Sequence, residues 1–199
     1  MTLPYKSLSD NACFVKIRPL ISIALIIYLL LLLNPALFAA DRGRVVSLKE
    51  LREQGVVMQQ WESSCAAAAV ATVLTYGFRD AVSEGYVAAR MLEHTNPKLV
   101  RKRGGFSLLD MKRFAEDRGY TGQAYRHLSL EDLRLFHAPI VPIAPHGYNH
   151  YVVFNGVQGQ RVLLADPAFG NRRMRISRFL DVWMDGLAFI IDRPLEERP

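Results

Sequence analysis

Residues 59–70 read Gln-Gln-Trp-Glu-Ser-Ser-Cys-Ala-Ala-Ala-Ala-Val, and the most informative pattern of the chain lies here. Either serine before Cys65 can cap a helix that begins at the cysteine, and the pattern predicts a helix to Tyr76 that Gly77 ends. Because alanine side chains are small, such a helix packs closely against its neighbours. The stretch therefore predicts a central, buried helix with a cysteine at its entrance.

Cys65 falls in the first turn of this helix, where unpaired backbone N–H groups and the positive end of the helix dipole favour a thiolate. This placement indicates a nucleophile. The alternative is a small buried hydrophobic residue, which is common for a free cysteine. The chain has only one other cysteine, Cys13, which excludes a disulfide-rich scaffold and a four-thiolate zinc site.

His150 opens one predicted strand and Asp166 closes the next. If residues 157–159 form a three-residue hairpin loop, the two side chains face each other across the ladder with Cβ atoms about 4.5–5.5 Å apart. At that distance a carboxylate can hold the Nδ1–H of an imidazole and fix its tautomer. The spacing therefore predicts a His–Asp pair.

An alternative turn at Asn155-Gly156 leaves Asp166 without His150, since a change of register moves side chains to other faces. We prefer the loop at 157–159 because it gives residues 162–164 apolar partners.

Two amide side chains precede the cysteine on the loop that leads into its helix. Gln59 lies six residues before Cys65, and Gln60 is its neighbour. An amide beside the backbone N–H of a nucleophile forms the donor pair that acyl transfer requires for its oxyanion. Spacing alone does not choose between the two glutamines.

Helical periodicity fills the chain from residue 61 to about 137, and β-branched runs follow from Pro139. Helices followed by strands imply an α+β fold with an antiparallel sheet. Further helices are expected at 83–93, from Ser107 to Gly119, from Ser129 and at 178–184, and strands at 140–143, 150–156, 161–166, 174–176 and 187–191.

The first forty residues have the pattern of a targeting segment. Lys16 and Arg18 precede an uncharged apolar run, Leu20–Leu33, and the sequence Ala-Leu-Phe-Ala-Ala follows before Asp41. This predicts a secretory signal peptide, with an uncleaved N-terminal membrane anchor as the alternative. In either case the positive flank places the rest of the chain outside the cytoplasm, in the periplasm or an equivalent compartment.

The expected organisation is a signal or anchor at 1–40, a linker at 41–54, one folded domain at 55–192 and a tail at 193–199. Half of the 199 residues are hydrophobic and 22% are charged, which excludes intrinsic disorder. The formal net charge is +6, but aromatic residues do not interleave with a basic stripe, so we expect no nucleic-acid partner.

Other polar clusters have simpler interpretations. His146 and His150 lie four residues apart, but no further ligands complete a zinc site, so we expect no metal and no cofactor. The basic run 101–103, followed by Gly104-Gly105, predicts a solvated loop. Arginines at 172, 173 and 175 predict an exposed strand edge that is charged against aggregation.

Three segments together resemble a known family. Residues 59–68, the run His150-Tyr-Val-Val-Phe-Asn-Gly and the run Leu-Ala-Asp166-Pro-Ala-Phe-Gly are similar to the peptidases that remove double-glycine leaders from bacteriocin precursors. Gly-Gly-Phe-Ser-Leu-Leu-Asp at 104–110 also resembles that family. The likeness implies a papain-like cysteine peptidase in which a helical part packs on an antiparallel sheet.

By this resemblance Cys65 is the nucleophile, His150 the base, Asp166 the orienting acid and Gln59 the oxyanion donor. The family usually has Asp-Cys-Gly where this chain has Ser64-Cys65-Ala66. The export signal and the short length resemble the stand-alone secreted branch, some members of which accompany secretion systems for extracellular functional amyloid.

The sequence thus predicts an exported cysteine endopeptidase whose partner is a polypeptide substrate, with components of a secretion or amyloid export system as candidates. Two alternatives stay open. One is a transglutaminase-like acyltransferase, which has the same Cys, His, Asp order. The other is a catalytically silent, peptidase-like module that binds a secreted polypeptide.

Overall fold

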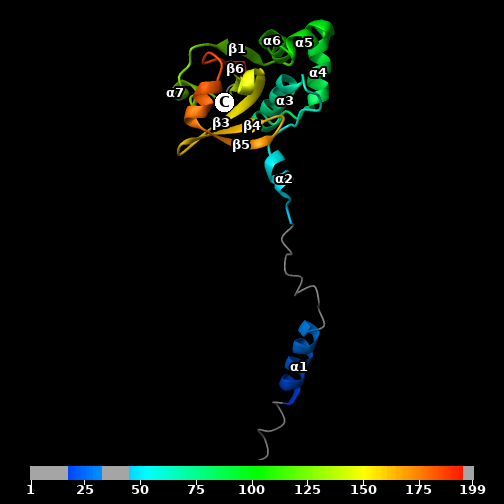
Figure 1. Cartoon of the computed structure of the whole chain (residues 1–199). Helices are drawn as coiled ribbons and strands as arrows, with labels where there is room; N and C mark the ends of the chain where they lie inside the picture. Colours follow the sequence, from blue (N-terminus) through cyan, green and yellow to red (C-terminus); the bar gives the residue numbers. More distant parts are fainter. Residues whose placement is uncertain (1–17, 33–44, 195–199) are drawn as a thin grey trace, which may run out of the picture. The chain divides into compact units, whose positions relative to one another are not determined.

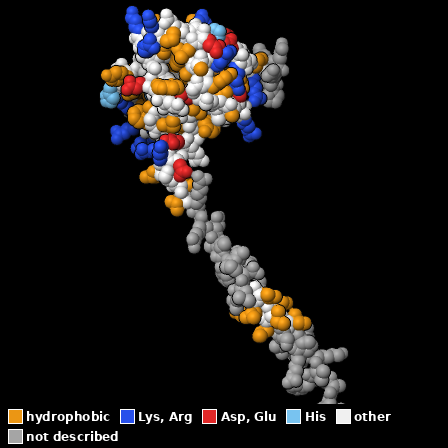
Figure 2. Space-filling view, turned by 90° about the vertical axis from the view of Figure 1, so that its right-hand side faces the viewer, with side chains coloured by type: hydrophobic (Ala, Val, Ile, Leu, Met, Phe, Trp, Pro, Cys, Tyr) orange, Lys and Arg blue, Asp and Glu red, His pale blue; other side chains and the backbone are white. Residues whose placement is uncertain are grey.

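A computed structural model describes residues 18–32 and 45–194, and the chain divides into two compact units, Met1–Val45 and Val46–Pro199. The first unit contains α1 (Arg18–Leu32), whose apolar side chains between Ile23 and Leu30 are exposed (Figure 2). Among the described residues, no helix is both long and apolar enough to cross a membrane. The expected signal cleavage region after residue 33, Cys13 and most of the expected tail lie outside the described residues.

The second unit is built on a six-stranded antiparallel sheet with the order β1-β6-β2-β3-β4-β5. Its strands are β1 (Thr121–Tyr125), β2 (Ile140–Ile143), β3 (His150–Gln158), β4 (Arg161–Asp166), β5 (Gly170–Arg175) and β6 (Ala188–Asp192). Strand β1 was not among the expected strands, because Thr-Gly-Gln-Ala-Tyr has no apolar alternation. This strand forms by pairing with β6, about 70 residues later in the chain.

The helices of this unit are α2 (Leu48–Glu53), α3 (Cys65–Thr72), the π-helical η2 (Val73–Gly77), α4 (Glu84–Glu93), α5 (Pro97–Arg103), α6 (Leu108–Asp117), α7 (Leu130–Leu133), the 3₁₀ turn η3 (Pro145–Gly147) and α8 (Ile176–Val182). Capping boxes at Ser107 and Ser129 start α6 and α7 where the sequence predicts them. The expected α+β class with an antiparallel sheet is confirmed.

Two helices differ from expectation. The basic run 101–103 is the last turn of α5 and not a loop, because Asn96 caps this helix, Pro97 follows in its first turn and Gly104 ends it with φ +77°. Cations also suit the negative end of a helix dipole. Within the range expected as a linker, 41–54, the structure has the capped helix α2.

Hydrophobic cores lie on both faces of the sheet. Helices α3, α4 and α6 cover one face, and α7 and α8 cover the other (Figure 1). Successive side chains of a strand point to opposite faces and so contribute to both cores: Phe189 belongs to the first and Ile190 to the second. Every side chain of α3 is buried, and its alanines allow close packing against α4 and β3, as expected of a central, buried helix.

The predicted hairpin loop at 157–159 is wrong. The loop is the two-residue Gly159-Gln160, since Gln158 pairs with Arg161, and Gly159 supplies the positive φ. The alternative turn at Asn155-Gly156 is also wrong, because the ladder shifts register there in a β-bulge, with Gly156 at φ +109°. Beyond the bulge Val153 pairs with Ala165, so Asp166 lies opposite residue 152.

His150 is therefore two residues away from the position opposite Asp166. Diagonal neighbours of this kind share a face and lie about 7–8 Å apart at their backbones, still within reach of long side chains. The pair predicted as directly opposite is diagonal instead.

Gly170 on β5 lies close against the backbone of α2. Its φ is +75°, and an added Cβ would lie 2.5 Å from the Arg52 carbonyl oxygen of α2. Gly159 has a φ of +55° but nothing within 4 Å of such a Cβ. We expect Gly159→Ala to lower the free energy of unfolding by about 1–2 kcal/mol through backbone strain alone. Gly170→Ala should lower it by about 1–3 kcal/mol more because of the clash.

Urea unfolding of both variants measures the difference. Equal losses for the two glycines would show that α2 does not hold its place against β5.

Candidate active site

The entrance to α3 places Cys65 beside the start of β3, where it interacts with His150. Ser64 occupies the N-cap position but makes no side-chain cap bond to the helix. Its hydroxyl instead donates to the Trp61 carbonyl at 2.8 Å and accepts from the Trp61 N–H at 3.2 Å. The first backbone N–H groups of α3 therefore do not donate to the Ser64 side chain, and the N–H of Cys65 is among them.

The Trp61 carbonyl also fixes one of the two candidate amides. Gln59 Nε2 donates to it at 3.0 Å, and the backbone N–H of Gln59 donates to the Pro167 carbonyl at 2.9 Å. Gln59 is therefore held between the loop that leads into α3 and the loop that follows Asp166. Its Oε1 is buried without a partner among the described residues.

Gln60 lies differently, because its side chain is exposed and its backbone N–H donates to Glu84 Oε1 at 3.2 Å. The structure thus distinguishes two glutamines that spacing alone left equal, and Gln59 is the one that the resemblance implies as oxyanion donor. Only Gln59 is bonded into the loop beside Cys65.

His150 and Asp166 are joined as predicted, although through the other ring nitrogen. His150 Nε2 lies 2.7 Å from Asp166 Oδ1, so Asp166 holds Nε2 and not the expected Nδ1. The diagonal placement of the two residues presents this side of the ring to the carboxylate. Nδ1 then remains for the Cys65 thiol, with which His150 also interacts.

The surroundings of His150 favour its charged form. Burial lowers the pKa of His150, but the hydrogen bonds and charges of Asp166 and Cys65 outweigh burial and raise this pKa to about 9. An imidazolium beside a thiol stabilises the thiolate, which is the nucleophilic form of cysteine.

Asp166 is fully buried and remains ionised through its partners. Burial raises the pKa of this carboxyl, but the hydrogen bond and charge of His150, the Ala168 N–H at 2.9 Å and the Arg172 guanidinium at 3.0 Å lower it below the usual value. The role of Arg172 was not expected from the sequence, which placed this residue on an exposed strand edge. Its strand β5 does lie at the edge of the sheet, but the Arg172 side chain turns to Asp166.

A cleft of about 310 Å³ opens beside the thiol. Its walls come from the end of α5, the glycine pair that follows, β3 and the loop before β3: Cys65, Arg103, Gly104, Gly105, Phe106, Ser107, Asn149 and Tyr151. Arg103 donates to Asp110 at 3.0 Å, and Asp110 also caps α6. The Gly-Gly-Phe-Ser segment is therefore the wall of a cleft that contains the cysteine.

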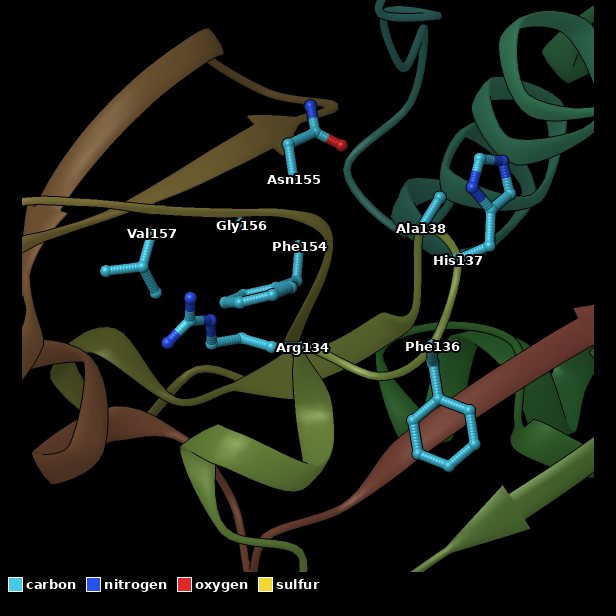
Figure 3. A pocket seen from close by; sticks show the side chains of 8 residues that line it. All are labelled: Arg134, Phe136, His137, Ala138, Phe154, Asn155, Gly156 and Val157. Atoms are coloured by element: carbon cyan, nitrogen blue, oxygen red, sulfur yellow. The ribbon is translucent and has the colours of Figure 1, made fainter.

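A larger pocket of about 520 Å³ lies elsewhere, between residues 134–138 and the bulge of β3 (Figure 3). Phe136 and His137 leave this segment in different directions, and Arg134 and Phe154 border the hollow. None of the sequence-predicted site residues lines it. Among the described residues, no group of three or more His, Cys, Asp or Glu is placed to hold a metal ion.

The sequence of this chain is similar to those of known peptidases. Residues 53–195 match the sequence pattern of the Peptidase C39 family. The chain is 36% identical over 181 residues to the Probable functional amyloid protease FapD of Pseudomonas aeruginosa, covering 84% of this chain and 78% of that protein.

Two solved structures are also similar. One is a double glycine motif protease from an AMS/PCAT transporter in complex with the leader peptide, with 25% identity and a TM-score of 0.58 over 70% of this chain and 91% of that one. The peptidase domain of Streptococcus ComA has the same TM-score at 23% identity, over 70% of this chain and 98% of that one. The expected papain-like peptidase fold is confirmed.

The raised pKa of His150 predicts how stability changes with pH. A folded-state pKa above the ordinary value of 6.5 gives stability that is fully present below about pH 6.5 and is lost as pH rises through about 9. We expect Asp166→Asn, which removes the carboxylate, to lose less free energy of unfolding over this interval than the wild type loses.

Urea unfolding at pH 6.5 and above pH 9 measures both losses. Asp132→Asn is the control, because Asp132 caps α7 through Ser129 and should leave the wild-type loss unchanged. Equal losses in wild type and Asp166→Asn would contradict the assignment.

Proposed function

Because the chain belongs to the Peptidase C39 family, we propose that it is an exported cysteine endopeptidase in which Cys65, His150 and Asp166 form the catalytic triad and Gln59 donates to the oxyanion. The observation that carries this proposal is the 2.7 Å contact between His150 Nε2 and fully buried Asp166, with the Cys65 thiol as the other partner of the ring.

The first half of the reaction uses the thiolate and the imidazolium. The Cys65 sulfur attacks the scissile carbonyl carbon, a C–S bond forms, and the carbonyl electrons move to the oxygen. The Cys65 backbone N–H and the second hydrogen of Gln59 Nε2 stabilise that oxyanion. His150 then gives its proton to the leaving amine, the C–N bond breaks, and a thioester remains.

The second half returns the enzyme to its starting state. Water attacks the thioester carbon while His150 accepts a proton from it, and the C–S bond breaks to release the carboxylic acid and the thiolate. Asp166 stays ionised throughout and holds Nε2–H, so that Nδ1 carries the transferred proton. Water is the acceptor in this scheme, which distinguishes a peptidase from an acyltransferase.

The substrate is proposed from the relatives. The names of the similar proteins refer to a functional amyloid protease and to a double glycine motif protease bound to a leader peptide. We propose a polypeptide substrate that is exported with this protein, with components of a secretion or amyloid export system as its source. The proposed location is the periplasm or another extracytoplasmic compartment, with export by residues 1–40 as a signal peptide or membrane anchor.

Loss of the thiol tests the proposed activity directly. We expect Cys65→Ala to abolish cleavage, because no other group described in the cleft can form the thioester. Mass spectrometry of terminal peptides from the secreted proteins of cells with wild type and Cys65→Ala measures this. Identical terminal peptides in the two strains would refute the proteolytic function.

The two neighbouring glutamines provide a matched test of the oxyanion donor. We expect Gln59→Ala to lower kcat by about 10²–10³-fold on a substrate peptide found in that comparison. Gln60→Ala should stay near the wild-type rate, since its side chain is exposed. Equal effects of the two substitutions on kcat would remove Gln59 from the proposed mechanism.

A further inference from the structure

The two oxygens of Asp166 have separate partners. Oδ1 lies 2.7 Å from His150 Nε2 and accepts hydrogen bonds from the Ala168 N–H at 2.9 Å and from the Phe169 N–H at 3.3 Å. Oδ2 accepts a hydrogen bond from Arg172 Nη1 at 3.0 Å. Asp166 has no exposed surface, so water is not available to replace a lost partner.

We infer that Arg172 is a positioning residue of this site, which holds the Asp166 carboxylate so that Oδ1 points at His150 Nε2. The inference rests on the proposed triad and goes beyond it, since it adds to the site a residue from a fifth segment of the chain. Arg172 lines no part of the cleft and does not touch the reacting atoms, so its action passes through Asp166.

The sheet register explains why this arginine reaches the carboxylate. On β5 the residue directly opposite Asp166 is Gly170, and Arg172 pairs with Leu164. Arg172 is thus the diagonal neighbour of Asp166 on one side, as His150 is on the other. Gly170 itself has no side chain that could contact Asp166, and the backbone of Arg52 in α2 lies where its Cβ would be.

The aromatic ring of Phe169 helps to hold the Arg172 guanidinium in place. The Cζ of Arg172 lies 5.4 Å from the centre of the Phe169 ring, within the range of a cation–π contact. Phe169 belongs to the turn between β4 and β5, and the backbone N–H of this turn at Ala168 also binds Asp166. The turn therefore holds the carboxylate and the cation together.

Loss of the arginine has two possible effects on His150, and they have opposite signs. If Arg172 orients Asp166, its loss leaves Oδ2 buried without a partner. The carboxylate then turns, its bond to Nε2 weakens, and the pKa of His150 falls. If Arg172 acts only as a nearby cation, its loss makes the imidazolium easier to form, and the pKa of His150 rises. Besides Asp166 itself, the ionisable groups that face the pair are Cys65 from α3 and Arg172 from β5.

Nitrogen NMR of histidine-labelled full-length protein follows the titration of the His150 ring. We expect Arg172→Gln to move the titration midpoint of His150 to lower pH than in the wild type. On a substrate peptide we expect kcat to fall about tenfold or more, with KM unchanged because the cleft is intact. A midpoint that stays in place or moves to higher pH would overturn the inference.

Arg173 provides the matched control. It is the next residue on β5, its side chain is exposed, and it pairs with Leu163, so it points to the opposite face. Arg173→Gln removes the same charge from the same strand and should leave the midpoint and kcat unchanged. An equal shift in both variants would show an effect of net charge and not of position.

Two further measurements separate folding from function. Thermal unfolding shows whether Arg172→Gln folds, and Arg172→Met, which keeps the apolar stem beside Phe169, is the second variant with the same expected shift. The NMR midpoint does not depend on cleavage. If wild type and Cys65→Ala release the same peptides, the proposed function fails, while the titration still decides whether Arg172 positions Asp166.

Discussion

The buried carboxylate of Asp166 is the constraint on which the rest of the site depends. An ionised group without exposed surface stays charged only when its oxygens are fully paired. The partners of Asp166 come from three segments: His150 on β3, Ala168 in the turn after β4 and Arg172 on β5. Satisfying one anion therefore fixes two strands and a turn relative to each other. The imidazole of His150 is thereby held in one orientation with a raised pKa, and its other nitrogen is left for the Cys65 thiol.

The small side chains of α3 allow this helix to pack close to the sheet at the site. The alanines of α3 have no exposed surface, and larger side chains at these positions would hold the helix farther from β3 and move Cys65 away from His150. A second tie joins the two halves, because the backbone of Gln59 binds the carbonyl of Pro167, the residue directly after Asp166. The loop that carries the proposed oxyanion donor is thus attached to the turn that carries the acid.

Short-range chemistry makes much of the fold predictable from the sequence alone. Serines with a carboxylate three residues later mark the starts of α6 and α7 because capping is a local interaction. The contact between His150 and Asp166 was predicted, but from a wrong loop and as a direct pair bonded through Nδ1. The bulge at Asn155-Gly156 and the two-residue turn at Gly159-Gln160 shift the register, so that His150 is two residues from the position opposite Asp166. The two side chains are long enough to reach each other across this diagonal.

Composition and short-range pattern point by themselves to the α+β class and to a cysteine at a helix entrance, and the resemblance of three motifs points to the family and to the candidate residues. The tertiary structure adds that the Gln59 side chain is bonded to the Trp61 carbonyl, that Nε2 of His150 faces Asp166, that the run 101–103 ends a helix beside the cleft, and that the Arg172 side chain binds Asp166. The contacts of Asp166 with His150 and Arg172 depend on how neighbouring strands pair and on their register. Sequence spacing records neither, because both are set by how the packed elements fit together.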